Sequence, residues 1–191
     1  MPERSLSIAF KEWRVVTDAL AQGVQTIILR KGGIAEGRGG FQLDWDRFLL
    51  FPTRFHQQGD SVVAEAKERL AALGGVGPED QPVEISAYAE VVEAREVRDL
   101  AAAQRLEGQH IWRPEVIASR FDWGRSKSIF AIAVRVHRLA TLRSFPMIEA
   151  YGGCKSWIEL EAPVDITQST PSLDDQQFEE RLQAFRGALE P

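Results

Sequence analysis

The sequence predicts an α+β fold: a single domain with a mixed, mainly antiparallel sheet flanked by helices. Residues 83–91 alternate apolar and polar side chains, the pattern of a strand with one exposed face. Residues 127–139 carry apolar side chains on both faces, which is typical of a central strand. Residues 173–189 place apolar side chains on one side of a helix. The chain has 191 residues, a length that suits one domain with one core.

The N-terminal part predicts one helix followed by two strands. Apolar side chains recur at three and four residues over Lys11–Gln22, and Gly23 follows as a helix stop. Val24–Arg30 contains a continuous apolar run, which indicates a strand covered on both faces. The glycine-rich residues 36–46 predict an exposed loop, and Phe48–Phe51 predicts a short strand.

The middle of the chain predicts three helices around the alternating strand. Asp60 is a good N-cap for an amphipathic helix that extends to Leu73 and ends at a glycine pair. Arg98–Glu107 is expected to be helical, and Pro114 suits the first turn of another short helix through about Phe121.

The C-terminal part predicts a last strand, a linker and a helix. The expected sheet is built from residues 24–31, 48–55, 83–97, 127–139 and 155–160. Residues 1–163 are therefore expected to form the α+β core domain. Residues 164–191 are expected to form a linker and a C-terminal amphipathic helix packed on that core.

Composition excludes several classes of protein. Apolar residues make up 44% and charged residues 27% of the chain, which is ordinary for a globular domain and unlike a disordered one. No apolar run is long enough to span a bilayer, and the N-terminus has no apolar stretch of signal-peptide length. A single cysteine, Cys154, excludes an internal disulfide and a cysteine-based zinc site. We therefore expect a cytoplasmic protein.

Charge is unevenly distributed along the chain, although the net charge is −5. Residues 1–58 carry eight Lys/Arg against six Asp/Glu, and residues 123–160 carry six against two. If these two blocks meet in the fold, they form a local basic patch on an acidic protein. The alternative is that the acidic segments are simply solvated outer faces of helices.

Three further motifs predict little chemistry. The glycines between Gly32 and Gly40 lack the lysine, the hydroxyl residue and the helix that a phosphate-binding loop requires. None of the three histidines stands three to five residues from another histidine or a cysteine, so the sequence predicts no local metal site. Cys154 could act as a nucleophile beside a distant histidine, but a lone cysteine in a Gly-Gly turn is more often just small and packed.

Basic and hydrogen-bonding residues gather where the predicted strands end. If the strand ends lie together, these residues form a cationic site for phosphate or another anion. Arginine can make bidentate hydrogen bonds to such an anion, and lysine provides a point charge. The alternative is a set of separate surface charges. The predicted binding residues are Arg30, Lys31, Arg54, His56, Gln57, Arg135, His137 and Lys155.

Three short blocks, LRKGGI, LFPTRFHQ and YGGCKSW, give the chain a family resemblance. The sequence resembles a bacterial family of unknown function, domain of unknown function 1802, from Lys11-Glu12-Trp13 to Trp157. The C-terminal helix would then be an extension. The resemblance implies no activity, cofactor or catalytic residue.

The favoured hypothesis is a binding domain for a phosphate-bearing ligand, most plausibly nucleic acid, that uses a basic cleft. The first alternative is a nuclease or phosphoesterase in which His56 or His137 is the general acid or base. The second is a protein-interaction module anchored by Phe41, Trp45 and Trp123. The sequence assigns no catalytic residue, no metal and no cofactor.

Overall fold

The computed structural model describes residues 4–31, 43–56, 58–75, 81–124 and 126–190. The strands are β1 (Ser5–Trp13), β2 (Ile27–Arg30), β3 (Arg47–Thr53), β4 (Val83–Val97), β5 (Ile129–Phe145), β6 (Trp157–Asp165) and β7 (Thr170–Pro171). The helices are α1 (Arg14–Ala21), α2 (Gln58–Ser61), α3 (Ala64–Ala72), α4 (Leu100–Gln104), α5 (Pro114–Asp122), α6 (Asp175–Leu189) and the 3-10 turn η2 (Glu149–Tyr151).

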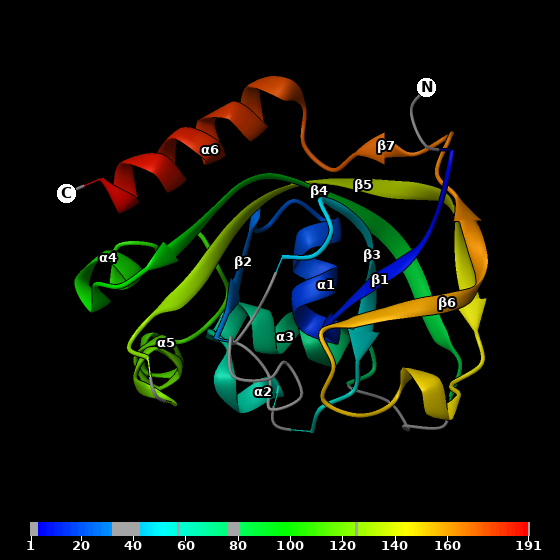
Figure 1. The fold of residues 1–191 in the computed structure, drawn as a ribbon, viewed down its shortest axis with the longest axis horizontal. Coiled ribbons are helices and arrows are strands. Elements are labelled where there is room, and N and C mark those ends of the chain that lie inside the picture. Colours follow the sequence, from blue (N-terminus) through cyan, green and yellow to red (C-terminus); the bar gives the residue numbers. More distant parts are fainter. Residues whose placement is uncertain (1–3, 32–42, 57, 76–80, 125, 191) are drawn as a thin grey trace.

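One mixed sheet organises these elements (Figure 1). Its strand order is β2-β5-β4-β3-β1-β6, and β7 pairs with β5 beside this path. Strands β1 and β3 run parallel, and the other pairings are antiparallel. The predicted α+β class with a mainly antiparallel sheet is therefore confirmed.

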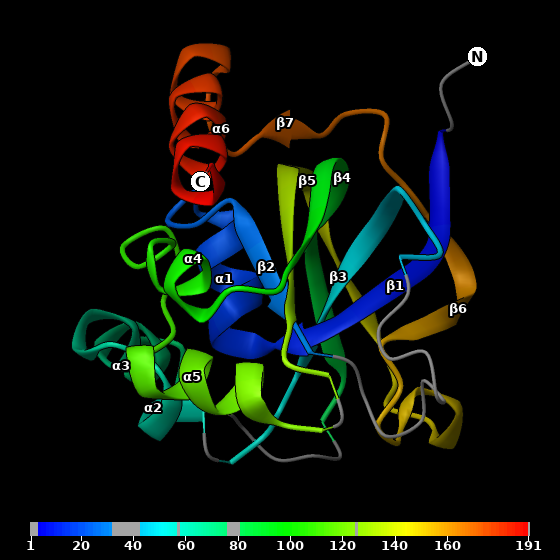
Figure 2. The same cartoon turned by 60° about the vertical axis from the view of Figure 1, so that its left-hand side comes forward.

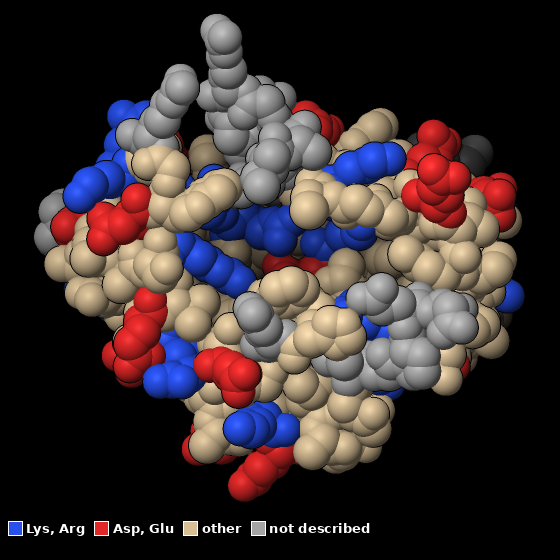
Figure 3. Space-filling view, turned by 90° about the horizontal axis from the view of Figure 1, so that it is seen from below, with Lys and Arg blue, Asp and Glu red and all other residues tan. Residues whose placement is uncertain are grey.

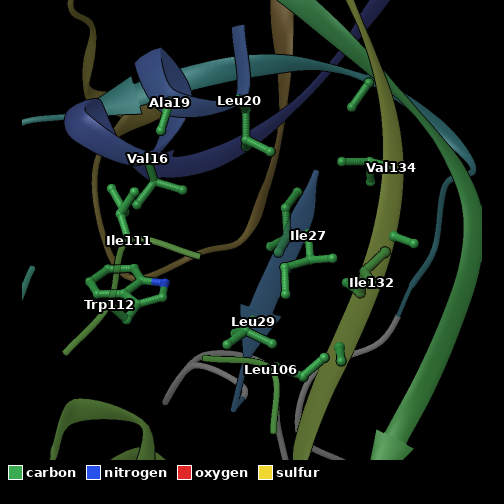
Figure 4. Packing of buried hydrophobic residues seen from close by; sticks show 14 of the residues in the cluster. Val16, Ala19, Leu20, Ile27, Leu29, Leu106, Ile111, Trp112, Ile132 and Val134 are labelled. Atoms are coloured by element: carbon green, nitrogen blue, oxygen red, sulfur yellow. The ribbon is translucent and has the colours of Figure 1, made fainter. Parts of the chain in front are cut away.

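Helices α1 to α5 lie on one side of the sheet (Figure 2). The main core fills the space between these helices and the sheet. Leu20 of α1, Ile27 of β2 and Ile132 of β5 are buried there together with Trp112 (Figure 4). A second, smaller core lies among β1, β3, β4 and β6 and includes Tyr151 of η2. Residues at the ends of β1, β2 and β3 border a cleft.

The N-terminus forms a strand that the sequence pattern did not predict. The helix was expected to begin at Lys11, but residues 5–13 form β1 and the helix begins at Arg14. Lys11 pairs with Phe51 of β3, and its backbone N–H donates to the Ser156 carbonyl oxygen at 2.8 Å. Sheet hydrogen bonds on both sides therefore override the helical spacing of the apolar residues.

The C-terminal strands are longer than predicted. Strand β5 continues to Phe145 instead of ending at residue 139, and β6 continues through Pro163 to Asp165. Proline is tolerated there because β6 is an edge strand. The short strand β7 lies within the segment expected to be only a linker.

Helix α6 packs on the main core through Phe178, Leu182 and Phe185. Asp174 caps it, and Arg186 forms an ion pair with Glu93 of β4 at 2.8 Å. No helix in the described part of the chain has the length and apolar character needed to cross a membrane. Most of the predicted 36–46 loop lies outside the described residues.

Candidate functional site

A cleft with a volume of about 600 Å³ opens where β1, β2 and β3 end. Lys11 and Trp13 reach it from β1, and residues 29–31 reach it from β2. Residues 51–55 come from β3 and the segment after it. The turn of residues 152–156, which leads into β6, completes the wall. A volume of this size is typical of small-ligand sites, which span about 300–1,000 Å³.

Cations dominate the polar lining of the cleft. No aspartate or glutamate is among the described residues that line it. Figure 3 shows blue side chains gathered around a hollow on this face of the molecule, with red acidic atoms visible deep inside it. The lining cations are Lys11, Arg30, Lys31, Arg54, Arg120 and Lys155. The cleft is thus a local positive site on a protein of net charge −5.

Aromatic side chains form another part of the wall. The Trp13 and Phe55 rings lie with their centroids 5.2 Å apart. Phe55 is 47% exposed and Trp123, which follows α5, is 54% exposed. Exposed aromatic rings beside cations can stack on planar groups of a ligand, as they do with nucleobases.

Lys11 is the most buried cation of the cleft, with 8% of its surface exposed. Its Nζ donates hydrogen bonds to the carbonyl oxygens of Tyr151 and Gly153, both at 2.7 Å. Burial lowers the pKa of Lys11, an effect that Cys154 opposes and that Lys155 and Arg30 reinforce. The two carbonyl bonds hold the ammonium in place without neutralising its charge.

Arg30 is fixed from three directions at the end of β2. It donates to Ser156 Oγ at 2.6 Å, lies 3.7 Å from the Glu12 carboxylate and lies 4.8 Å from the centre of the Phe10 ring. Glu12 is 2% exposed and does not line the cleft. The guanidinium is therefore held in one position at the cleft wall.

Arg120 of α5 stacks against the aromatic cluster behind the cleft. Its guanidinium carbon lies 3.7 Å from the centre of the Trp112 ring and 5.5 Å from that of Trp13. Burial lowers the pKa of Arg120 to about 10, Glu12 raises it and Arg30 lowers it. The side chain therefore stays cationic at neutral pH.

Lys31 uses its ammonium to join separate segments. Its Nζ donates to the carbonyl oxygens of Phe121 at 2.9 Å and Ser128 at 2.8 Å, and also to that of Ser126. Burial lowers its pKa, and Asp122 and Glu96 raise it. Lys31 thus ties the end of β2 to the segment that carries Trp123.

Arg54 and Lys155 differ in how firmly the protein holds them at the cleft. Arg54 donates to the carbonyl oxygens of Gln81 and Pro82, both at 2.6 Å. Lys155 is exposed, and its hydrogen bond to the Ala150 carbonyl oxygen is long at 3.5 Å. Lys155 is therefore the lining lysine with the greatest freedom to reach a ligand.

The two predicted residues on β5 lie away from the cleft. Arg135 pairs with Asp175 of α6, and its guanidinium carbon lies 5.3 Å from the centre of the Phe178 ring. His137 stacks on Tyr88 with ring centroids 4.8 Å apart. Neither residue lines the cleft. Arg135 helps to hold α6 on the sheet.

The distance along the sheet explains this separation. Arg30 pairs with Phe130 in the β2–β5 register. Arg135 lies five residues further along β5, about 16 Å at the usual rise of a strand. The basic residues of segments 1–58 and 123–160 therefore do not come together at Arg135. Lys155 is the basic residue of the second segment that lies at the cleft with those of the first.

The histidines lie outside the cleft lining. His56 is exposed in the turn after Arg54, and His110 is 7% exposed. Burial, with a smaller contribution from the Arg120 charge, lowers the pKa of His110 to about 4. The predicted residue Gln57 lies outside the described residues. In the described part of the chain, no group of three or more His, Cys, Asp or Glu side chains could hold a metal.

The sequence pattern did not indicate four residues of the cleft lining, namely Lys11, Trp13, Phe55 and Arg120. The first two were assigned to a helix, whereas β1 places both at the cleft. Polar and apolar side chains alternate only over residues 5–8, which is too short a signal to predict β1. Arg120 carried no local signal, because its role depends on Trp112 and Trp13.

Comparison with known proteins gives a family and a few similar structures. The crystal structure of ASCH from Zymomonas mobilis has a TM-score of 0.45 at 10% identity, and 93% of each chain is covered. Two mutant forms of the Zymomonas mobilis protein give TM-scores of 0.46 and 0.45 at 12% and 11% identity. These comparisons cover 92% of this chain and 96% and 94% of the others. No curated protein matches the sequence.

The family match covers most of the chain. It begins at residue 9, within β1, and ends at residue 184, within α6. Every described residue that lines the cleft falls inside this range. The chain belongs to the family described as "Domain of unknown function (DUF1802)".

Proposed function

We propose that this protein is a binding domain for a phosphate-bearing ligand, with nucleic acid as the ligand class, and that the basic cleft is its binding site. The observation that carries the proposal is the lining of the cleft: six lysines and arginines and, among the described residues, no carboxylate. A cleft of one charge sign concentrates oppositely charged ligands.

The fixed position of Arg30 favours a specifically bound phosphate group over loosely associated anions. Arg30 is fixed by Glu12 and Ser156, so its guanidinium loses little freedom when it binds an oxyanion. Lys155 adds a mobile point charge at the rim. A fixed guanidinium with a nearby lysine suits a phosphate group better than a single surface charge does.

The aromatic wall supports nucleic acid among phosphate-bearing ligands. Phe55 and Trp123 are about half exposed and line the same cleft as the cations. Proteins that bind single strands combine a positive groove with aromatic rings on which bases stack.

Binding of a fluorescent single-stranded oligonucleotide, measured over a range of salt concentrations, tests the proposal. Affinity should fall steeply with salt, and the slope of log K against log salt should decrease in magnitude by about 0.7 for each phosphate that a variant no longer neutralises. Lys155→Ala is expected to lower the slope in this way. Lys67→Ala, which removes an exposed lysine of α3 outside the cleft, is the matched control. Equal effects of the two variants would place the binding elsewhere.

The enzymatic alternative has less support from the histidines. A general acid or base must reach the ligand, yet neither His56 nor His137 lines the cleft. The same titrations, followed by a search for cleaved oligonucleotide, separate binding from turnover. Cleavage that His56→Ala abolishes without unfolding would favour the nuclease or phosphoesterase hypothesis.

The protein-interaction alternative concerns three aromatic residues, of which Trp123 also lines the cleft. Trp45 is 46% exposed and does not line the cleft, and Phe41 lies outside the described residues. A protein partner that is retained at high salt and lost in Trp45→Ala would favour this alternative over the proposed one.

A further inference from the structure

We infer that the cleft holds one nucleotide unit in a fixed direction, with its phosphate between Lys11 and Lys155 and its base against Phe55. This inference rests on the proposed function and adds to it the position of each ligand group. It starts from the one buried charge in the described cleft lining that has no opposite charge.

Lys11 is a buried ammonium without a carboxylate partner. Its Nζ is bonded to two carbonyl oxygens, and within the described residues no carboxylate lies within 4.0 Å of it. The cations Lys155 and Arg30 are close enough to lower its pKa. Burying an ammonium is costly unless an opposite charge compensates it. A ligand phosphate would supply that charge.

The turn beside Lys11 offers further hydrogen-bond donors. Within the described part of the chain, the backbone N–H groups of Gly153, Cys154 and Lys155 donate to no protein acceptor. All three residues are exposed and line the cleft. Gly153 has a φ of 72°, a left-handed conformation that favours glycine. Consecutive backbone N–H groups in such turns commonly bind anions.

The aromatic residues of the cleft lie close to this phosphate position, because Trp13 follows Lys11 on β1. Lys11 and Trp13 are two residues apart on β1, about 7 Å between their Cα atoms. The Trp13 ring contacts the Phe55 ring on one side and Trp112, at 4.7 Å, on another. Trp13 is therefore largely occupied by protein neighbours, whereas Phe55 is 47% exposed. Of these two stacked rings, Phe55 is thus the one open to a base whose phosphate lies at Lys11.

Calorimetric titration of the full chain with four probes tests this arrangement. The probes are inorganic phosphate, a nucleoside, the corresponding nucleoside 5′-monophosphate and a short single-stranded oligonucleotide. The monophosphate should bind at least tenfold more tightly than either the nucleoside or inorganic phosphate. A monophosphate that binds no better than these two parts would overturn the inference.

Two variants separate the two ends of the site. Lys155→Ala should weaken binding of the monophosphate about tenfold and leave the nucleoside unchanged. Phe55→Leu should weaken the nucleoside and the monophosphate and leave inorganic phosphate unchanged. Lys67→Ala and Trp45→Leu, both outside the cleft, are the controls. If both cleft variants weakened all probes equally, the assigned direction would be wrong.

Lys11→Met gives an independent test of the buried charge. The variant leaves the Tyr151 and Gly153 carbonyl oxygens without the Lys11 donor, so it is expected to fold with reduced stability. It should lose monophosphate binding more than tenfold. Retained binding in a folded Lys11→Met variant would remove Lys11 from the phosphate position, and if the variant does not fold, Lys155→Ala decides the same question.

The oligonucleotide distinguishes failure of the inference from failure of the proposed function. Salt-dependent oligonucleotide binding that is sensitive to Lys155→Ala, without monophosphate binding, would leave the proposed function intact and reject the single-nucleotide site. No binding of either probe would reject both. If both bind, tenfold tighter oligonucleotide binding identifies single-stranded nucleic acid as the source of the nucleotide unit, and equal affinities identify free nucleotides.

Discussion

The Glu12 carboxylate lies 3.7 Å from the Arg30 guanidinium at the back of the cationic cleft. Glu12 is 2% exposed, and it also raises the pKa of Arg120. Because Glu12 is absent from the cleft lining, it holds Arg30 in place and favours the charged form of Arg120 while the described lining keeps only positive charges. The buried Glu12 carboxylate therefore stabilises the positive charges of Arg30 and Arg120 from behind the cleft.

Glu12→Gln should tighten binding of the oligonucleotide several-fold at low salt, because it removes a negative charge close to the cleft. It should also lower the free energy of unfolding by about 1–3 kcal/mol, since Arg30 loses its charged partner. Binding titrations and urea unfolding measure the two effects. Glu161→Gln, an exposed site on β6, is the control. Equal tightening in both variants would mean that net charge alone controls affinity.

Lys31→Met tests whether Lys31 positions the cleft wall. Its ammonium donates to the carbonyl oxygens of Phe121 and Ser128, so its loss should reduce stability by about 1–3 kcal/mol. Fluorescence of Trp123 should become easier to quench with acrylamide, because the segment after α5 loses its tie to β2. Trp123→Phe in the same background identifies the signal.

Lys127→Met is the matched control for this prediction. Lys127 is 75% exposed and pairs with Asp122 at 3.3 Å, so its loss should change stability by less than about 0.5 kcal/mol. If Lys31→Met were as stable as the original chain but did not bind the ligand, Lys31 would contact the ligand directly.

The strands could be predicted where side chains alternate or form long apolar runs. β4 and the first part of β5 are long enough to show their periodicity. β1 could not be predicted in this way because its last residues, Lys11 to Trp13, fit the helical spacing of α1. Only the pairing of β1 with β3 and β6 resolves that ambiguity, and pairing is not a local property of the sequence.

The candidate site was predictable to the extent that it lies at strand ends. Arg30, Arg54 and Lys155 line the cleft because β2, β3 and the turn before β6 meet there. Arg135 and His137 belong to the predicted site only if β5 ends near residue 139. The strand instead continues to Phe145, so both residues lie in its middle and contact α6 or β7.

Stability should fall as the pH decreases below about 6.5, because His110 is buried in the neutral form. Burial lowers its pKa to about 4, so between the two values the unfolded chain binds a proton that the folded chain does not. At pH 5 this difference costs about 2 kcal/mol relative to pH 8. Unfolding in urea at the two pH values measures it.

His110→Asn is the comparison for the pH effect. Asparagine can still accept the hydrogen bond that His110 Nδ1 receives from the Trp112 backbone N–H at 3.2 Å. The variant should show a smaller loss of stability between pH 8 and pH 5 than the original chain does. An unchanged pH dependence would assign it to other groups, of which His137 is the first candidate because its pKa is also lowered by burial.

Phe185→Ala tests whether α6 is an integral part of the core. Phe185 is fully buried in the main core, and removing a buried phenylalanine side chain typically costs about 3–5 kcal/mol. Urea unfolding should show this loss in the same cooperative transition that reports on the sheet. Gln183→Ala, on the exposed face of α6, should change stability by less than about 0.5 kcal/mol. A Phe185→Ala variant as stable as the original chain would mean that α6 is an appendage to a core that ends near residue 163.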